Sequence, residues 1–195
     1  MASRGQQIGI WIIAVVLTVG TIGSFLVLIL QNDNAAKDTA TSQDDYAKQL
    51  AEYTKQQKEA SEANAANSVA FEDYKAEEFD AASVTALQKD ILVLGTGDEV
   101  KTTDTIKASY FGWTSDGKIF DSSKKKDTDD APVAFPLSGV IKGWTDGLAG
   151  QRVGSTVKLT IPADQAYGAT GSGVIPANAP LQFIVVIRSI EAATN

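Results

Sequence analysis

The sequence contains no cysteine and no histidine. Without cysteine the chain can form no disulfide, no thiolate metal site and no lipid-modified N-terminal cysteine. Without histidine it has no imidazole to act as a general base, which excludes the usual hydrolytic triads. The formal net charge is −7, and the chain has no long basic stretch. Because phosphate binding needs clustered Lys and Arg, we do not expect nucleic acid as a partner.

Charge is also absent from the 23 residues between Ile8 and Leu30. At about 1.5 Å per residue, a helix of this length crosses a bilayer core of roughly 30 Å. The run is longer than the apolar region of a cleavable signal peptide, about 7–15 residues, and a poor cleavage site follows it. We therefore expect a retained transmembrane helix over residues 8–30, with a cleaved signal peptide as the alternative.

The orientation of this helix is predicted from the basic residues on either side. Arg4 and the N-terminal amine precede the helix, whereas the first basic residue after it, Lys37, has acidic neighbours. The bias of positive charge toward the cytoplasm places residues 1–7 inside the cell. The chain is thus expected to be a single-pass membrane protein with its C-terminal part on the extracytoplasmic face.

The next segment, residues 31–83, is rich in Ala, Gln, Lys and Glu and shows no strand pattern. Good helix formers dominate from Asp44 to about Ala66. Tyr46, Leu50 and Tyr53 fall on one helical stripe, but the stripe ends too soon for a coiled-coil seam. The pattern predicts a solvated, partly helical stalk.

The composition changes at Val84, just after a short apolar patch that contains Phe71, Tyr74 and Phe79. From there Gly and Pro separate short runs of Val, Ile, Thr and aromatic residues, a pattern typical of β-strands. Strands dominate without alternating with helices, so we expect an antiparallel α+β domain over residues 84–191 and a tail at 192–195. The apolar patch is expected to pack against this domain.

The expected elements of the domain follow from its apolar runs and turn residues. Strands are predicted at Gln88–Leu94, Thr105–Thr114, Val133–Leu137, Gly154–Ile161 and Leu181–Ile190. SDGK at Ser115–Lys118 indicates a turn with its glycine at a positive φ, and a short helix is expected at Lys142–Ala149. The charged residues from Lys124 to Asp130 are expected to form a solvated loop.

The domain offers little for acid–base or metal chemistry. Its carboxylates form no obvious catalytic pair and no glycine-rich phosphate loop follows a strand, so we expect neither a metal nor a cofactor. The unusual feature is an apolar and aromatic set flanked by Gly and Pro: Tyr110, Phe120, Phe135, Val140, Ile141, Trp144, Tyr167, Ile175 and Phe183. Such residues can line a cleft. On composition alone, ordinary core packing explains the set at least as well.

The order of three sequence blocks is more specific than composition. The blocks are IKASYFGWTSDGKIFDSS, FPLSGVIKGWTDGLAG and LTIPADQAYGATGSGVIPANAPLQFIVVI. In this order they resemble the FKBP-type, macrolide-binding family of peptidyl-prolyl cis/trans isomerases (EC 5.2.1.8), and its bacterial members in particular. The resemblance covers residues 84–191 and implies an antiparallel sheet curved around a short α-helix.

The resemblance also implies an apolar pocket that accelerates rotation of the X-Pro bond during protein folding. The residues that match the family's catalytic positions are Tyr110, Phe120, Asp121, Trp144, Tyr167 and Phe183. Those that match positions contacting the substrate are Phe135, Val140, Ile141 and Ile175. Two departures are visible: Val133 stands where some members have an aromatic residue, and the loop from Gly168 to Val174 is slightly shorter.

The partners implied by the resemblance are proline-containing polypeptides as substrates and macrolides as inhibitors. Two other functions remain open from the sequence. The fold can serve as a chaperone or adaptor with little catalytic activity, or the anchor and stalk can be the working part, as a scaffold at the membrane.

Overall fold

The computed structural model describes residues 39–71 and 74–191, with side chains from Ala47 onward. The chain divides into two compact units, Met1–Ser61 and Glu62–Asn195, which are described separately below. The predicted membrane helix at residues 8–30 lies outside the described residues. Within the described ranges, no helix is both long enough and apolar enough to cross a membrane.

Helix α2, Thr39–Asn67, is the described element of the first unit and continues into the second. Leu50 and Tyr53, on the apolar stripe seen in the sequence, are exposed. An ion pair between Lys55 and Glu59 joins successive turns on its surface. Good helix formers and such pairs support a solvated helix. The segment predicted to be partly helical is therefore helical from Thr39 to Asn67.

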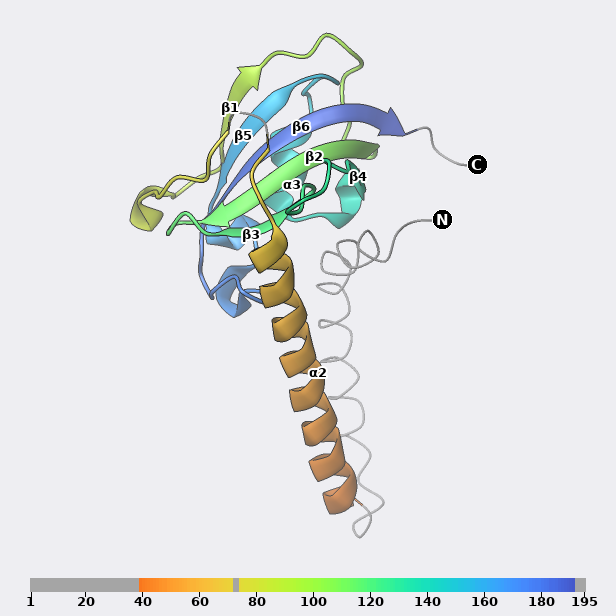
Figure 1. The fold of residues 1–195 in the computed structure, drawn as a ribbon, viewed down its shortest axis with the longest axis vertical. Coiled ribbons are helices and arrows are strands. Elements are labelled where there is room, and N and C mark those ends of the chain that lie inside the picture. Colours follow the sequence, from red (N-terminus) through yellow and green to blue (C-terminus); the bar gives the residue numbers. More distant parts are fainter. Residues whose placement is uncertain (1–38, 72–73, 192–195) are drawn as a thin grey trace. The chain divides into compact units, whose positions relative to one another are not determined.

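The second unit contains an antiparallel sheet that curves around the short helix α3, Lys142–Leu148 (Figure 1). Its strands are β1 (Gln88–Val93), β2 (Thr105–Thr114), β3 (Ile119–Ser122), β4 (Val133–Pro136), β5 (Thr156–Ile161) and β6 (Leu181–Glu191). The strand order is β1-β5-β6-β2-β3, and β4 also pairs with β2. The expected class, an antiparallel α+β fold, is confirmed for this unit.

Strand β2 is the centre of the sheet. One of its edges pairs with β6 along the whole strand, and the other edge is shared by β4, beside residues 105–108, and β3, beside residues 111–113. Because β3 and β4 lie along the same edge, the chain between them must leave the sheet and return. The loop at residues 123–132 makes this excursion and carries the cluster of lysines.

The two faces of the sheet are covered by different parts of the chain. Side chains alternate between the faces along a strand, so Tyr110 and Phe183 face α3 while Phe111, Trp113 and Ile184 face the opposite side. The second face lies under residues 70–71 and 74–79. Burial on both sides explains why β2 and β6 read as nearly continuous apolar runs.

Residues 70–71 and 74–79 pack on the sheet, as was predicted from the apolar patch. Phe71 is 2% exposed and meets the Phe111 ring edge-on at 5.3 Å. The indole N–H of Trp113 donates to the Glu77 carbonyl at 2.9 Å, and the Phe79 N–H donates to the Ser115 carbonyl at 3.1 Å. The compact unit thus includes residues well before Val84.

Most predicted strands lie within two residues of the observed ones. Strand β5 begins at Thr156 rather than Gly154, because Gly154 has a φ of 91°, outside the β region. Strand β3, which has four residues, was not predicted. The turn at Ser115–Lys118 is present, with Gly117 at a φ of 73°.

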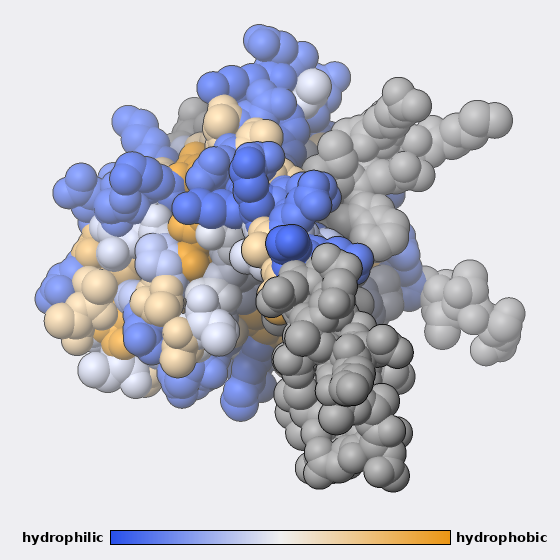
Figure 2. Space-filling model, turned by 90° about the horizontal axis from the view of Figure 1, so that it is seen from below, coloured by the Kyte–Doolittle hydropathy of each residue, from blue (hydrophilic) through white to orange (hydrophobic). Residues whose placement is uncertain are grey.

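Edge strand β1 leaves its apolar side chains at the surface. Ile91, Leu92 and Val93 are all exposed, and Leu94 just beyond the strand is 71% exposed. Figure 2 likewise shows apolar residues, in orange and tan, at the surface between hydrophilic ones. The core of the second unit therefore depends on β2, β5 and β6 more than on β1.

We expect Phe71→Ala in the full chain to lower the free energy of unfolding by about 3–5 kcal/mol, because it removes a buried ring from the face formed by Phe111 and Trp113. Leu50→Ala, at an exposed position of α2, is the control and should change stability by less than about 0.5 kcal/mol. Urea unfolding measures both. Equal effects would contradict the placement of Phe71 in the core.

Candidate active site

Aromatic residues predicted from the sequence form one continuous cluster on the α3 side of the sheet. Trp144 of α3 meets the rings of Tyr110, Phe135 and Phe183 at centroid distances of 5.4, 5.0 and 5.4 Å. Phe183 in turn meets Phe120 at 5.5 Å. The interplanar angles run from 69° to 84°, the edge-to-face geometry that aromatic pairs favour. Residues from five separate elements therefore share one apolar site.

Two glycines of α3 set the position of Trp144 at the centre of this cluster. A Cβ on Gly143 would come within 2.3 Å of the Ile161 side chain, and one on Gly147 within 2.6 Å of Leu159. Larger residues would push α3 away from β5, since real Cβ contacts are not that short. The sequence KGWTDGL thus lets the helix lie close to the sheet and bring its indole among the strand rings.

Gly112, on β2, is a site residue that sequence reasoning missed. A Cβ at this position would lie 2.4 Å from the Phe183 ring and 2.6 Å from the Phe120 ring. The glycine is directly opposite Phe183 in the sheet register. Its absent side chain leaves the space in which the two rings meet. A glycine inside a strand rich in aromatics was the available signal.

The remaining predicted positions lie in the segments that follow β4 and β5. Val140 and Ile141 are partly buried where α3 begins, and the Ile141 carbonyl accepts the Trp144 N–H at 2.9 Å. Ile175 is buried in a loop closed by two backbone bonds with Ser172, at 2.8 and 2.9 Å. These apolar side chains are therefore held by fixed backbone.

The carboxylate of Asp121 is buried beside the rings and is fully partnered. The Tyr110 hydroxyl donates to Oδ2. Oδ1 accepts from the Ser122 N–H at 2.8 Å, the Asn64 amide at 2.8 Å and the Lys125 ammonium at 3.0 Å. Asp121 is only 5% exposed. Such partners are what a charge in an apolar site requires.

The two tyrosines near this carboxylate have raised pKa values. Burial raises the pKa of Tyr110 well above its ordinary value, and the charge of Asp121 and its hydrogen bond act in the same direction. Burial, with a further contribution from Asp121, raises the pKa of Tyr167 to about 12. Both hydroxyls are therefore protonated donors throughout the neutral range.

Two of the partners of Asp121 were not expected. Lys125 was predicted to lie in a solvated loop, and this was wrong because its ammonium is bonded to a buried carboxylate, with 26% of the side chain exposed. Asn64 was assigned to the stalk, and the structure buries it. Asn64 lies 57 positions from Asp121 in the sequence, and Lys125, four positions after it, is in a loop rather than a helix, so spacing predicts neither contact. Across residues 39–71 and 74–191, no acidic cluster suited to a metal ion occurs.

Comparison with known proteins identifies the domain that carries these residues. Residues 97–188 match the family model described as FKBP-type peptidyl-prolyl cis-trans isomerase. Residues 97–188 are an FKBP-type domain. The match contains every ring of the aromatic cluster, together with Gly112 and Asp121, but it leaves Asn64 outside.

Similarity to individual proteins extends beyond this domain. The chain is 36% identical over 168 residues to the FKBP-type peptidyl-prolyl cis-trans isomerase FkpA of Aeromonas hydrophila, covering 82% of this chain and 62% of that protein. It is 36% identical over 139 residues to FkpA of Escherichia coli K12, covering 71% and 50%. A crystal structure of a peptidyl-prolyl cis-trans isomerase from Pseudomonas syringae pv. tomato is 34% identical, with a TM-score of 0.49 and coverage of 54% and 76%. The chain thus spans 62% or less of the two curated relatives.

The close approach at Gly112 predicts a specific effect of adding one methyl group. Gly112→Ala should force apart the Phe120 and Phe183 rings of the FKBP-type domain and lower the free energy of unfolding by about 1–3 kcal/mol. Gly139→Ala is the matched control, because a Cβ there meets only a Pro136 side-chain atom, at 3.7 Å. Urea unfolding and the NMR signals of the two rings measure the effect. A Gly112 variant as stable as the Gly139 variant would contradict the packing described.

The raised tyrosine pKa values predict a late alkaline titration. Tyr167 should ionise near pH 12 and Tyr110 well above the ordinary tyrosine range, as followed by tyrosinate absorption after a rapid pH jump. Unfolded tyrosines release their protons near pH 10, so the free energy of unfolding should fall as the pH rises past about 10. Tyr167→Phe should remove one of the tyrosine ionisations seen above pH 10. Ionisation of all tyrosines near pH 10 in the folded chain would contradict the raised pKa values of Tyr110 and Tyr167.

Proposed function

We propose that this chain is a peptidyl-prolyl cis/trans isomerase that acts on proline-containing polypeptides. The observation that carries the proposal is the edge-to-face ring cluster around Trp144, with the Asp121–Tyr110 pair beside it. The match of residues 97–188 to the FKBP-type family supports the same activity. Phe120, Trp144 and Phe183 hold the proline ring of the substrate.

The proposed mechanism uses the apolar character of the site rather than a nucleophile. Amide resonance sets the rotation barrier of about 18–20 kcal/mol, and the twisted transition state loses that resonance. The twisted amide is less dipolar than the planar one, so an apolar site that excludes water stabilises it relative to the ground state. This is differential binding of a transition state. It needs no proton transfer, which suits a chain without histidine or cysteine.

Polar groups at the edge of the cluster orient the substrate in this mechanism. The Ile141 N–H and the Tyr167 hydroxyl donate hydrogen bonds to substrate carbonyls, and Phe135, Val140 and Ile175 complete the apolar wall. The raised pKa of Tyr167, about 12, supports its role as a donor at neutral pH. Macrolides that enter the same apolar site compete with the substrate.

The proposal also includes a membrane anchor. Residues 8–30 form a retained helix, residues 1–7 lie in the cytoplasm and the isomerase domain lies on the extracytoplasmic face. The uncharged run and Arg4 before it support this arrangement. The mass of the mature N-terminus and extraction of membranes with alkaline carbonate test it. A chain that begins after residue 30, or one released by carbonate, would refute the anchor.

A proline-limited refolding assay with the full chain in detergent micelles tests the activity. We expect acceleration of the slow refolding phase in proportion to the amount of chain added. Absence of acceleration, with client binding that Trp144→Leu leaves unchanged, would instead favour a chaperone or adaptor role for the domain.

Two substitutions should separate hydrogen bonding from the shape of the pocket. Tyr167→Phe removes one ordinary hydrogen bond and should lower kcat/KM by about fivefold or less. Phe120→Ala opens the apolar wall to water and should lower kcat/KM by more than about tenfold. Phe79→Ala, on the opposite face of the sheet, is the control and should retain activity. The reverse order of Tyr167→Phe and Phe120→Ala would contradict an apolar mechanism.

A further inference from the structure

We propose that Asn64 and Lys125 are positioning residues of the isomerase site, so that α2 contributes one side chain to the support of that site. This inference rests on the proposed isomerase function. Both act on the ring cluster through the carboxylate of Asp121, and the Asn64 amide makes a second, longer hydrogen bond to the Phe120 carbonyl at 3.4 Å.

Three side chains form a closed hydrogen-bonded triangle at this point. The Asn64 amide nitrogen donates to Asp121 Oδ1 at 2.8 Å, and its amide oxygen accepts from Lys125 Nζ at 2.7 Å. Lys125 Nζ closes the triangle with Asp121 Oδ1 at 3.0 Å. Its third bond goes to Ser68 Oγ at 2.9 Å. All three N–H donors of the ammonium are therefore used, and the amide of Asn64 pairs at both ends.

The triangle lies mostly out of contact with water. Asn64 is 9% exposed and Ser68 is 7% exposed. Hydrogen bonds to a charged group are stronger than neutral ones, and the low local dielectric strengthens them further. Leaving such a group without its partner is costly. The Asn64 amide is therefore an effective restraint on the carboxylate of Asp121.

This restraint helps to fix the plane of the Asp121 carboxylate. The terminal torsion of an aspartate is broad and roughly two-fold, so the side chain alone does not fix its two oxygens. Asn64 and Lys125 hold Oδ1 together with the Ser122 N–H, which leaves Oδ2 facing the Tyr110 hydroxyl. Tyr110 in turn packs edge-on against Trp144, at the centre of the proposed pocket. The position of the Tyr110 ring therefore depends in part on Asn64 of α2.

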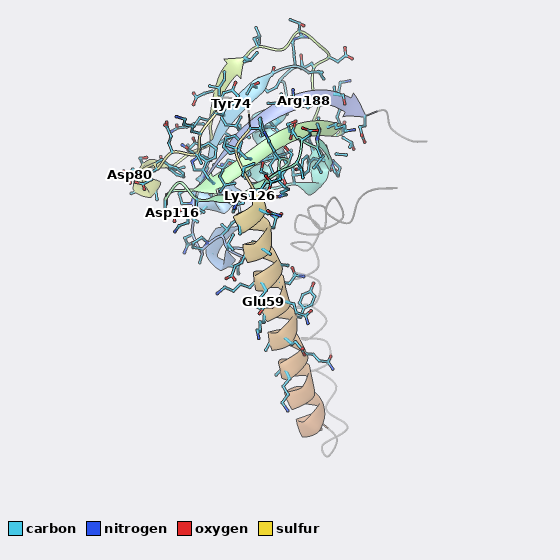
Figure 3. All side chains as sticks on the ribbon, viewed as in Figure 1. Glu59, Tyr74, Asp80, Asp116, Lys126 and Arg188 are labelled. Carbon is cyan, nitrogen blue, oxygen red and sulfur yellow. The ribbon has the colours of Figure 1, made fainter. Side chains whose placement is uncertain are left out.

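Backbone pairing holds α2 and the lysine loop together. The Lys126 N–H donates to the Asn67 carbonyl at 2.9 Å, and the Val69 N–H donates to the Lys124 carbonyl at 3.2 Å. Ser68 and Lys125 form an isolated antiparallel bridge between these two bonds. Figure 3 shows Lys126 beside the C-terminal end of α2. The side chains of Asn64 and Lys125 are thus presented to Asp121 from fixed backbone.

A double-mutant cycle in the full chain tests whether Asn64 acts through Asp121. Asn64→Ala should lower kcat/KM roughly fivefold, by loosening the carboxylate. In an Asp121→Ala background the same change should have a much smaller effect, because the carboxylate that Asn64 positions is gone and only its longer bond to the Phe120 carbonyl remains. Asn67→Ala is the matched control, since it removes the same side chain from an exposed position one turn along α2. It should leave kcat/KM unchanged.

A readout that needs no catalysis separates this inference from the isomerase proposal. Asn64→Ala should shift the NMR signals of the Tyr110 ring and the Trp144 indole N–H, and Asn67→Ala should not. If the unmodified chain fails to accelerate isomerisation, the proposed function falls while these signals still decide the positioning role. Asn64→Asp keeps the size of the side chain and replaces its donor with a second carboxylate, so it serves if the alanine variant does not fold.

Two results would overturn the inference. One is an Asn64→Ala variant whose Tyr110 and Trp144 signals match those of the Asn67→Ala variant. The other is a loss of kcat/KM on Asn64→Ala that is equally large with and without the Asp121 side chain, because the residue would then act by another route.

Discussion

The buried carboxylate of Asp121 is the constraint around which the site is arranged. Moving an unpaired charge into an apolar environment costs far more than a domain's net stability, so such a group must be neutralised and hydrogen-bonded. Here the partners come from β2, from the residue that follows Asp121, from the lysine loop and from α2. The hydrogen bonds to this one carboxylate therefore join four segments beside the apolar cluster.

The same strands serve both as core and as site. Along β2 the side chains of Tyr110 and Phe111 point to opposite faces, one into the aromatic cluster and the other under Phe71. A residue with no side chain, Gly112, separates Phe111 from Trp113 and leaves room for two rings. Stability and site geometry are therefore built from neighbouring positions of one strand. The site is held by the packed sheet as well as by the loops around it.

The sequence predicted much of this arrangement, for physical reasons that differ from one element to another. Strands β2 and β6 were clear because long apolar runs bounded by turns leave few alternatives. The rings of Tyr110, Trp144 and Phe183 were predicted to share a site because the sequence blocks that contain them follow the order seen in FKBP-type proteins. The Asn64–Asp121 contact was beyond sequence reasoning, because 57 positions separate the two residues and their meeting depends on how α2 docks on the lysine loop. Lys125 was misread because a run of charges is usually solvated.

Catalysis in an apolar site without proton transfer is the central claim, and the dependence of kcat/KM on pH tests it most directly. NMR exchange spectroscopy on a short X-Pro peptide reports the interconversion rate with and without the full chain. The account predicts exchange cross-peaks that need the chain, and a kcat/KM that stays nearly constant from about pH 6 to pH 9, because Tyr110 and Tyr167 keep their protons there. A clear bell-shaped profile over this range would contradict it.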